Sequence, residues 1–473
     1  MTVVLGAGLA GLSAGYILSK SGIRVTVIEK GSSVGGLART VCHNGFRFDL
    51  GGHRFLTKDL QVGHFINDLL KEDILAAQRK SRIFMSGRYF DYPLKPLNAI
   101  FGLGLLNTTS ILYDYLKEKA RGLISSPDLT SLEDWVVNQF GRMMFEIYFR
   151  QYSEKVWGMD CSRISSEWVA QRINGLSLQE AVLNAFFRFS GKDIPTLTDS
   201  FFYPKMGIGQ ISTTLAMGIE ERNNLLTNTK VLQINHQDYN VRSISVMNSK
   251  DIYDIEGREF VSSIPLPDLI NSLQPSAPDK VLEAASRLKF RDLIIVTIML
   301  DRQRVSDLTW LYLPEKEILI GRIHEPKNWS SRMAPDGYTH LVSEYFCFRG
   351  DSMWNKSDTD LIDLTVKQMR SLSLIRGDEV MDAYVLRVPD AYPLLTVGYS
   401  RPYQKVLDYL NSFNNLHIIG RTGMFRYYNM DQAIETGMTA ANRLVHKLRG
   451  VAAPDRYMAD SPVYSLSETA SCN

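Results

Sequence analysis

A glycine turn at the start of the chain carries the clearest chemical signal. It follows the apolar run at residues 2–5 and precedes a helical pattern. The turn has the spacing G-x-G-x-x-G and consists of Gly6, Gly8, Leu9, Ala10 and Gly11. Glu29 ends the next apolar run, at residues 23–28. Such glycines let a pyrophosphate approach the backbone, and such an acid accepts hydrogen bonds from an adenosine ribose, so the pattern predicts a dinucleotide site. The carboxylate disfavours the 2′-phosphate of NADP.

A second glycine turn extends this expected site. It begins at Lys30 and continues through Gly36 and Leu37 to Arg39. A second backbone cradle with a cation beyond it suits a longer diphosphate cofactor. No further G-x-G-x-x-G occurs downstream, so we expect no separate NADPH domain and an external source of electrons for the cofactor.

Motifs along the chain resemble the UDP-galactopyranose mutases and, more broadly, protoporphyrinogen-oxidase-like and amine-oxidase-like flavoproteins of one superfamily. Besides the two glycine turns, the resemblance is carried by residues 149–158, 168–172, 288–291 and 420–432, with support from 51–53 and 203–209. It implies an α/β fold in which a Rossmann-like FAD-binding domain carries inserted helical and mainly β substrate regions. It also implies FAD bound in an extended form, with Arg39 near the pyrophosphate.

The resemblance assigns further residues to FAD. Val231 would lie against the adenine, and His53 would face the flavin, although a lone loop histidine is more often merely hydrogen-bonded. The helix expected at residues 431–448 would direct unpaired N–H groups and its positive end at the flavin pyrimidine ring. An ordinary capped surface helix is the alternative. The remaining cofactor positions are Gly52, Gly420, Arg421, Met430, Asp431 and Gln432.

Substrate-binding residues are also implied by the resemblance. Arg172 and Arg291 could clamp a substrate diphosphate through bidentate hydrogen bonds, with Tyr427 sharing that duty. Trp157 offers a flat face for a base, and Tyr152 belongs to the same motif. For either arginine alone a surface ion pair is the common alternative, and for Trp157 a place in the core.

The catalytic set expected from the resemblance comprises His53, Arg172, Arg291, Tyr427 and Asn429. Bacterial mutases have D-M-D-Q where this chain has Asn429 and the three residues after it. Because an amide carries no charge, a neighbouring cation would lose its partner and the geometry beside the sugar could differ.

The leading functional hypothesis is a flavin-dependent nucleotide-sugar mutase. The resemblance implies interconversion of pyranose and furanose rings through an adduct of the sugar with N5 of reduced FAD, without net oxidation. The alternative is an FAD-dependent oxidoreductase acting on a sugar, an amine or a polycyclic substrate. A non-catalytic subunit stabilised by FAD is a third reading, disfavoured because cofactor motifs usually accompany cofactor chemistry.

Composition narrows the partners. The chain has 473 residues, 45% hydrophobic and 22% charged, and a net charge of +2 from 53 basic and 51 acidic residues. This balance argues against nucleic acid as a partner and leaves anionic ligands to locally placed cations. The four cysteines are scattered, so no metal site is indicated. We expect a cytoplasmic protein without a transmembrane segment, and a homodimer remains open.

Secondary-structure patterns position these motifs. Helical spacing marks residues 60–75, 97–120, 131–150 and 178–189. Strand patterns mark residues 230–235, 241–247, 259–263, 293–300, 310–313, 318–323, 340–348, 382–388 and 416–421. We therefore expect a discontinuous FAD-binding domain made of residues 1–72, 201–285 and 405–450. Residues 73–200 would form a helical substrate domain, 286–404 a β-sheet substrate domain, and 451–473 a flexible tail.

Overall fold

A parallel sheet forms the core of the nucleotide-binding part of the molecule. The computed structural model describes residues 1–92, 105–124, 128–168 and 200–451. The sheet has the order β20, β13, β1, β2, β9. Its strands are β20 (Leu416–Ile418), β13 (Glu259–Ser262), β1 (Thr2–Leu5), β2 (Val25–Ile28) and β9 (Asn224–Leu226). β1 and β2 are buried along their whole length, as expected where helices or other layers cover both faces. The predicted α/β fold class is confirmed.

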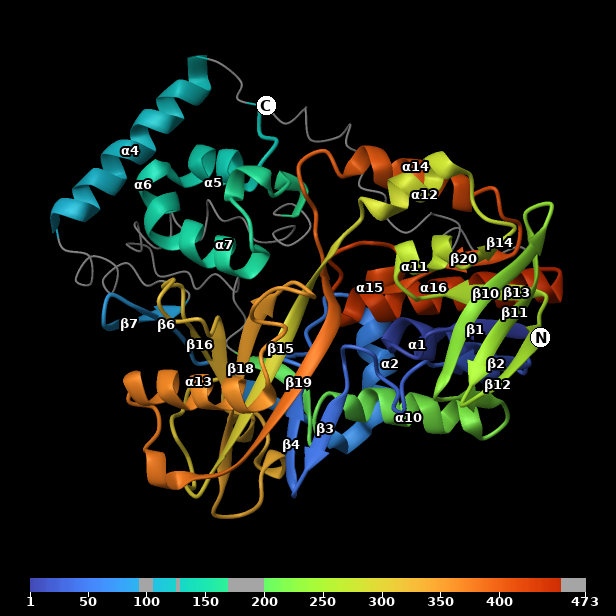
Figure 1. Ribbon diagram of the computed structural model, residues 1–473, viewed down its shortest axis with the longest axis horizontal. Coiled ribbons are helices and arrows are strands. Elements are labelled where there is room, and N and C mark those ends of the chain that lie inside the picture. The colour runs from blue at the N-terminus through green and yellow to red at the C-terminus, as the bar shows by residue number, and fades with distance from the viewer. Residues whose placement is uncertain (93–104, 125–127, 169–199, 452–473) are drawn as a thin grey trace.

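Helices from distant parts of the chain cover this sheet (Figure 1). They are α1 (Leu9–Lys20), α2 (Leu60–Leu70), α10 (Gly209–Glu220) and α16 (Met430–Arg449). α16 packs closely on α1, because Gly437 has no side chain where a Cβ would lie 2.2 Å from the carbonyl oxygen of Ala10. The N-terminal nucleotide-binding unit is thus completed by residues near the other end of the chain.

A smaller mixed sheet and three helices extend this part. The strands are β12 (Asp251–Glu256), β11 (Asn240–Asn248), β10 (Thr229–Gln237) and β14 (Leu273–Gln274), in that order. The helices are α11 (Leu266–Asn271), α12 (Asp279–Ser286) and α14 (Ser400–Leu410). Strand β10 begins at the cavity described below, where it brings Val231 to the lining.

A seven-stranded sheet forms the second large layer. Its order is β19, β15, β18, β17, β16, β6, β7. The strands are β19 (Val380–Pro393), β15 (Phe290–Leu300), β18 (Thr339–Cys347), β17 (Arg322–His324), β16 (Trp310–Tyr312), β6 (Ser81–Met85) and β7 (Arg88–Tyr92). Helix α13 (Asp358–Ser371) packs against β15 and β19. Two antiparallel pairs lie outside this sheet: the hairpin of β3 (Thr40–His43) and β4 (Phe46–Asp49), and the long-range pair of β5 (Ile74–Gln78) and β8 (Ser200–Pro204).

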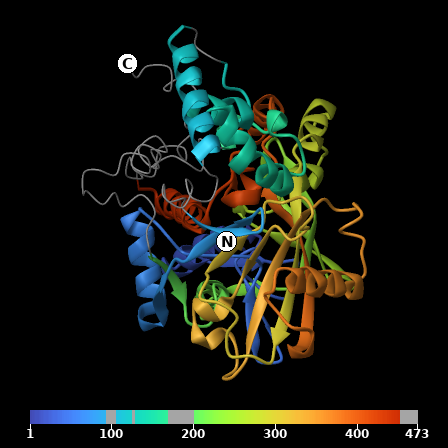
Figure 2. The ribbon, with the colours of Figure 1, turned by 90° about the vertical axis from the view of Figure 1, so that its left-hand side faces the viewer.

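A helical region stands at one end of the molecule, above the seven-stranded sheet (Figures 1 and 2). It contains α4 (Leu105–Ile124), α5 (Leu132–Phe140), α6 (Arg142–Met144), a π-helix (Phe145–Arg150) and α7 (Gln151–Trp157). Gly141, at a φ of +86°, interrupts the single helix expected over residues 131–150. The helix predicted at 178–189 and the tail from 452 lie outside the described residues.

The strands β5, β6 and β7 are absent from the prediction, which gave residues 73–200 a helical character. The helix expected over 60–75 ends at Leu70, because Lys71 has a φ of +50° and reverses the chain. Ser86 and Gly87 then form a two-residue turn with positive φ at both positions, the geometry that joins twisted antiparallel strands. In the described ranges no helix has the length and apolar character needed to cross a bilayer.

Candidate functional site

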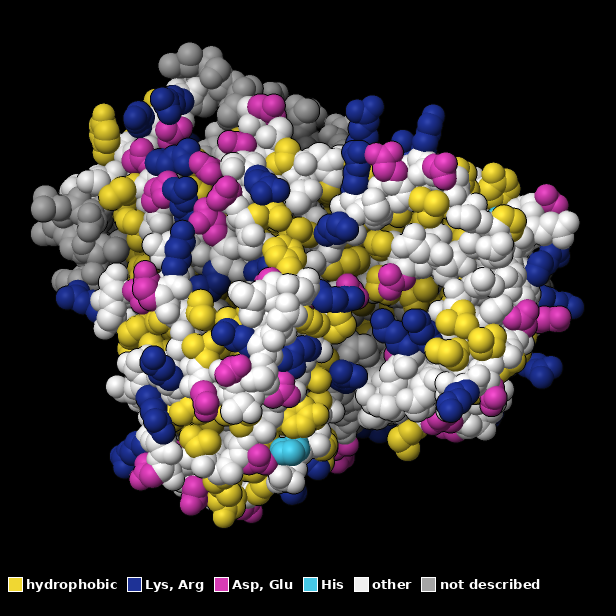
Figure 3. Space-filling view, in the orientation of Figure 1, with side chains coloured by type: hydrophobic (Ala, Val, Ile, Leu, Met, Phe, Trp, Pro, Cys, Tyr) yellow, Lys and Arg dark blue, Asp and Glu magenta, His cyan; other side chains and the backbone are white. Residues whose placement is uncertain are grey.

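One large cavity runs between the nucleotide-binding part, the seven-stranded sheet and the helical region. Its volume is about 1320 Å³, and its lining comes from both ends and the middle of the chain. The face of the molecule in Figure 3 carries interspersed charges of both signs, in keeping with the balanced composition. An anionic ligand is therefore attracted by the individual cations that line the cavity and not by a net charge of the whole surface.

The first glycine turn forms the outer end of the cavity. Gly6 has a φ of +94°, and its N–H donates to the carbonyl of Ile28 at 2.8 Å. A Cβ at Gly11 would lie 2.0 Å from the carbonyl oxygen of Gly6, so Gly11 permits the close packing of α1 on the turn. A Cβ at Gly8, in contrast, would meet nothing within 4 Å, because it would project into the cavity. The N-terminus of α1 therefore faces a space that a pyrophosphate could fill.

Glu29 lies beside this turn with both carboxylate oxygens fixed by the backbone. Oε2 accepts a hydrogen bond from Ala7 N at 2.9 Å, and Oε1 accepts one from Gly31 N at 2.8 Å. Each oxygen keeps a lone pair for another donor, which is what ribose hydroxyls require. Lys30 and Val231 line the cavity next to Glu29, where the cofactor assignment places the adenosine.

The second glycine turn packs against the first. Gly35 N donates to the carbonyl of Ala7 at 2.7 Å, and Gly36, Leu37 and Arg39 line the cavity. The Nε of Arg39 is buried and has no hydrogen-bond partner among the described residues. A buried guanidinium nitrogen without a partner at a glycine cradle fits the diphosphate of FAD.

The loop at residues 51–53 lies at the inner end of the cavity. Gly52 N donates to Glu344 Oε1 at 3.0 Å, and His53 Nδ1 donates to the carbonyl of Gly51 at 3.2 Å. The pKa of His53 is lowered to about 4, chiefly by burial; the charges of Arg322 and Arg421 also lower it, whereas the bond to Gly51 raises it. The imidazole is therefore neutral at pH 7, and with Nδ1 as the donor its Nε2 can accept a hydrogen bond.

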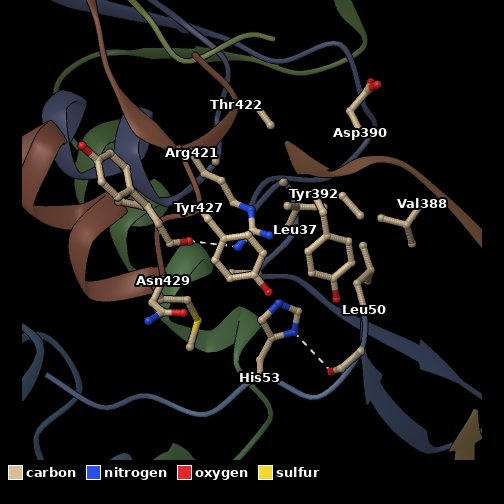
Figure 4. A pocket seen from close by; sticks show the side chains of 18 of the residues that line it. Leu37, Leu50, His53, Val388, Asp390, Tyr392, Arg421, Thr422, Tyr427 and Asn429 are labelled. Carbon is tan, nitrogen blue, oxygen red and sulfur yellow. Dashed lines mark hydrogen bonds between the residues drawn. The ribbon is translucent and has the colours of Figure 1, made fainter. Parts of the chain in front are cut away.

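Arg421 lies opposite His53, beside two tyrosine rings (Figure 4). Its guanidinium carbon is 4.4 Å from the ring centre of Tyr427 and 5.0 Å from that of Tyr392, and Nη1 donates to the carbonyl of Tyr428 at 2.9 Å. Nε and Nη2 are buried without hydrogen-bond partners in the described part of the chain. Two free donors of a buried cation at the cavity suit an anionic or carbonyl-bearing ligand.

The N-terminus of α16 completes this inner end. Asn429 caps the helix, and its backbone N–H donates to Gln432 Oε1 at 3.0 Å in a capping box. Residues 427–433 and Gly420 all line the cavity, so the first turn of the helix is exposed to a bound ligand. Burial raises the pKa of Asp431, whose Oδ1 has no hydrogen-bond partner in the described residues.

Aromatic rings line the part of the cavity beyond Tyr427. The rings of Tyr392 and Tyr427 are stacked at 5.9 Å and 17°, and Tyr152 meets Tyr312 edge-on at 5.7 Å. Helical and strand residues continue the wall: Ile83, Met85, Tyr92, Leu132, Trp135, Val136, Tyr148, Phe149 and Trp168. This region offers flat and apolar surface for a second ligand.

Two predicted substrate residues do not lie in the cavity. Trp157 is 1% exposed and packs edge-on against Trp168, Tyr392 and Tyr427, so it supports the cavity wall as a core residue. Arg291 is 5% exposed, and its Nε and Nη2 donate to the carbonyls of Val156 at 3.1 Å and Phe346 at 2.9 Å. Nε and Nη2 of Arg291 are thus taken by the backbone, and Arg291 does not line the cavity in which the predicted diphosphate clamp would lie. Arg172 lies outside the described residues.

Another arginine takes a place at the cavity that the sequence did not reveal. Arg322 lines the cavity, forms an ion pair with the buried Glu344 at 2.6 Å, and donates from Nη2 to the hydroxyl of Tyr392 at 2.8 Å. Arg54 and Arg79 line the same region, with Arg79 over the ring of Tyr92 at 5.1 Å. One signal was available: a glutamate inside the apolar strand at 340–348 must have a partner when buried.

Known proteins share this fold. The sequence model of the family described as flavin containing amine oxidoreductase matches residues 9–445. Protoporphyrinogen oxidase 2, chloroplastic/mitochondrial, from Arabidopsis thaliana is 22% identical over 454 residues, covering 87% of each chain. The structure of a reduced UDP-galactopyranose mutase superposes with a TM-score of 0.80 at 21% identity, covering 97% of each chain. A putrescine oxidase bound to putrescine gives a TM-score of 0.65 at 17% identity, covering 94% of this chain and 98% of the other.

Proposed function

The chain belongs to the family of flavin-containing amine oxidoreductases and is an FAD-dependent enzyme. Within this family we propose that it is a nucleotide-sugar mutase. The proposed reaction converts a nucleotide-activated pyranose into its furanose with the cofactor in the reduced state. An external reductant would supply the electrons. The similarity to a reduced UDP-galactopyranose mutase over 97% of both chains supports this choice within the family.

The observation that carries the proposal is the size and lining of this cavity. The cavity extends from the glycine turns, past the side chains of His53, Arg421 and Tyr427, to the helical region. Its volume is about 1320 Å³. Pockets for one small ligand usually measure about 300–1,000 Å³, so this cavity suits a dinucleotide and a second ligand together. Aromatic rings and arginines at its far end suit the base and the diphosphate of a nucleotide sugar.

FAD, when bound and reduced, would supply the nucleophile for exchange at the anomeric carbon without net oxidation. Arg322, held by Glu344, and Arg79 would neutralise the departing diphosphate in place of Arg291. The neutral imidazole of His53 would accept a hydrogen bond at Nε2 from a donor above the 51–53 loop. Tyr392 and Tyr427 would flank the sugar and exclude water.

The test is a panel of UDP-, GDP- and TDP-hexoses incubated with the FAD-loaded enzyme, before and after reduction by dithionite. The expected result is a product of unchanged mass and shifted chromatographic retention, formed only by the reduced enzyme and lost on reoxidation. A reduced enzyme that interconverts none of these sugars would contradict the proposal.

A second candidate is an FAD-dependent oxidoreductase acting on an amine, a sugar or a polycyclic substrate. The family itself and the apolar residues Ile83, Met85, Leu132 and Val136 at the far end of the cavity favour it. This activity would start from oxidised FAD without added reductant. Bleaching of the flavin absorbance by an amine or a tetrapyrrole under anaerobic conditions would support this candidate over the mutase.

A further inference from the structure

Lys155 on α7 binds a loop instead of a ligand. Its Nζ lies within hydrogen-bond distance of four backbone carbonyls of the segment between β16 and β17, so its three N–H groups are shared among them. The bonds to Glu315 and Ile318 measure 2.6 and 2.7 Å, the bond to Ile320 measures 3.4 Å, and the bond to Leu313 is the shortest. The loop at residues 313–321 therefore curls around one ammonium group.

A ring of carbonyl oxygens around a cation is how a protein coordinates a bound monovalent ion. An ammonium group has three N–H donors and no acceptor, so carbonyls are suitable partners. The carboxylate of Glu315 is engaged elsewhere, because its Oε1 accepts from Ser86 N at 2.6 Å. The cation is thus held mainly by carbonyl dipoles, which would repel one another if the charge were removed.

Both ends of this loop lead directly to residues that line the cavity. Tyr312 ends β16 just before the loop, and Arg322 begins β17 just after it. Tyr152 lies on α7, three residues before Lys155, and its ring meets that of Tyr312 at 5.7 Å. Lys155 therefore connects the helical wall of the cavity to the strand wall that bears Arg322.

Arg291 fixes the other side of this connection. Its Nη2 and Nε donate to the carbonyls of Lys155, at 3.4 Å, and Val156, at 3.1 Å, near the C-terminal end of α7. A cation at a helix C-terminus satisfies carbonyls that have no partner within the helix. The backbone of Lys155 is thus anchored on β15 while its side chain holds the loop.

We propose that Lys155 is a positioning residue: its ammonium group, enclosed by the carbonyls of residues 313–320, holds Tyr312 and Arg322 in register with Tyr152. The inference concerns the shape of the cavity and goes beyond the proposed reaction. Its first test, the mobility of the loop, needs no substrate.

Burial supports this role, since it lowers the pKa of Lys155 to about 8 against the opposing charges of Glu315 and Glu317. Glu154, on the same helix, pairs with Arg150 at 3.1 Å and with Lys316 of the loop at 3.6 Å. Loss of the Lys155 proton is accordingly the change expected inside the ring of carbonyls as the pH rises past 8.

Hydrogen–deuterium exchange of the FAD-loaded enzyme tests the proposal with a matched pair of variants. Lys155→Met removes the charge inside the ring, and Lys316→Met removes a 68% exposed lysine from the same loop. We expect exchange in peptides covering 313–321 to rise at least tenfold in Lys155→Met and to stay unchanged in Lys316→Met. Equal protection in both variants would overturn the proposal.

Chemical rescue distinguishes a charge requirement from simple packing. In Lys155→Ala the missing atoms correspond to n-propylammonium, and 1-propanol is a neutral molecule of similar size. Saturable recovery of loop protection with n-propylammonium, but not with 1-propanol, is expected. Equal recovery with both, or recovery with neither, would show that the ring does not require a cation.

UDP binding provides a readout of the cavity that rests on the proposed function. We expect Lys155→Met to weaken UDP binding about tenfold and Lys155→Arg to restore part of that loss. If the wild type itself does not bind UDP, the proposed function fails while the exchange result still decides the role of Lys155.

The wild type decides the matter if the variants do not fold. Exchange in 313–321, corrected for the intrinsic pH dependence, should lose protection between pH 7 and pH 9.5, while peptides of α13 do not. Unchanged protection over this range would contradict the proposal.

Discussion

The two ends of the cavity are built by different means. At the nucleotide end the chemistry belongs to backbone groups: the turns at Gly8 and Gly36, and the N-terminus of α1. At the inner end it belongs to side chains from separate strands, chiefly Arg322, Arg421 and Glu344. The spacing of glycines in the sequence predicts a site made of backbone groups. A site made of side chains instead depends on which strands become neighbours in the folded protein.

The largest expected effect is the loss of FAD affinity when a side chain is introduced at the nucleotide end of the cavity. In Gly8→Val the new side chain enters the space proposed for the pyrophosphate, and its Cβ meets no protein atom within 4 Å. FAD affinity should fall at least 100-fold, about 3 kcal/mol. Fluorescence titration with FAD measures this loss.

The apo-protein supplies the control for this variant. Its melting temperature should match that of the wild type within about 2 °C. Gly11→Ala should instead impair folding, since its Cβ would lie 2.0 Å from the Gly6 carbonyl oxygen. If Gly8→Val retains full FAD affinity, the nucleotide end of the cavity does not bind FAD through the backbone at Gly8, and the contrast with the inner end is lost.

Breaking the ion pair at the inner end should cost nearly as much. Glu344→Gln leaves the buried guanidinium of Arg322 without its counter-charge, so the free energy of unfolding should fall by about 3 kcal/mol. Urea denaturation measures the change. Glu221→Gln breaks the exposed pair with Lys20 and should leave the free energy of unfolding nearly unchanged. Equal losses in the two variants would show that burial does not set the strength of the Arg322 pair.

Variants of Arg291 and Arg79 distinguish a residue that supports the cavity wall from one that binds a ligand inside the cavity. Arg79→Gln should weaken UDP binding about 30-fold, roughly 2 kcal/mol, and leave stability unchanged. Arg291→Gln should lower stability, because three backbone carbonyls lose their donor, and should weaken UDP binding less than Arg79→Gln does, because it acts only through the backbone of Lys155. Isothermal titration calorimetry and urea denaturation of both variants give the comparison. If UDP binding is weakened in Arg291→Gln but not in Arg79→Gln, then Arg291 and not Arg79 binds the diphosphate.

The smallest effect concerns the charge of His53. Its pKa of about 4 in the folded state lies below the ordinary 6.5, so the folded state disfavours protonation. The stability that this preference supplies is fully present above pH 6.5 and is lost as the pH falls towards 4. His53→Asn should therefore reduce the loss of unfolding free energy between pH 7 and pH 5 by on the order of 1 to 2 kcal/mol. If the free energy of unfolding falls by the same amount between pH 7 and pH 5 in both proteins, the inference that His53 is neutral in the folded state is wrong.

The comparison also explains how far the sequence could lead. The α/β class, FAD and the strands at 259–262 and 416–418 follow from local patterns, because glycine spacing and buried strands are local properties. Arg291 and Arg322 both lie in strand segments, and no local property distinguishes the one that faces backbone from the one that faces the cavity. Only the pairing of β17 with β18, which places Arg322 opposite Glu344, separates them.

The helical wall illustrates the same limit. Trp157 lies in a motif-like segment, yet its neighbours Tyr392 and Tyr427 come from the last hundred residues of the chain and enclose it. The strands β6 and β7 were missed because their stability depends on β16, more than two hundred residues away. Side-chain burial and edge pairing of this kind depend on tertiary structure, which local propensity does not contain.

The packing of Gly437 on Ala10 has a consequence for biosynthesis. The strand β20 and the helix α16 that complete the N-terminal unit are synthesised long after the first glycine turn, so the nucleotide-binding sheet cannot be completed before they emerge from the ribosome. Contacts this distant in sequence carry a large loop-closure cost and form late. FAD loading is therefore expected to follow synthesis of α16, and a nascent chain stalled before residue 416 would present an incomplete nucleotide-binding sheet to the cell's chaperones.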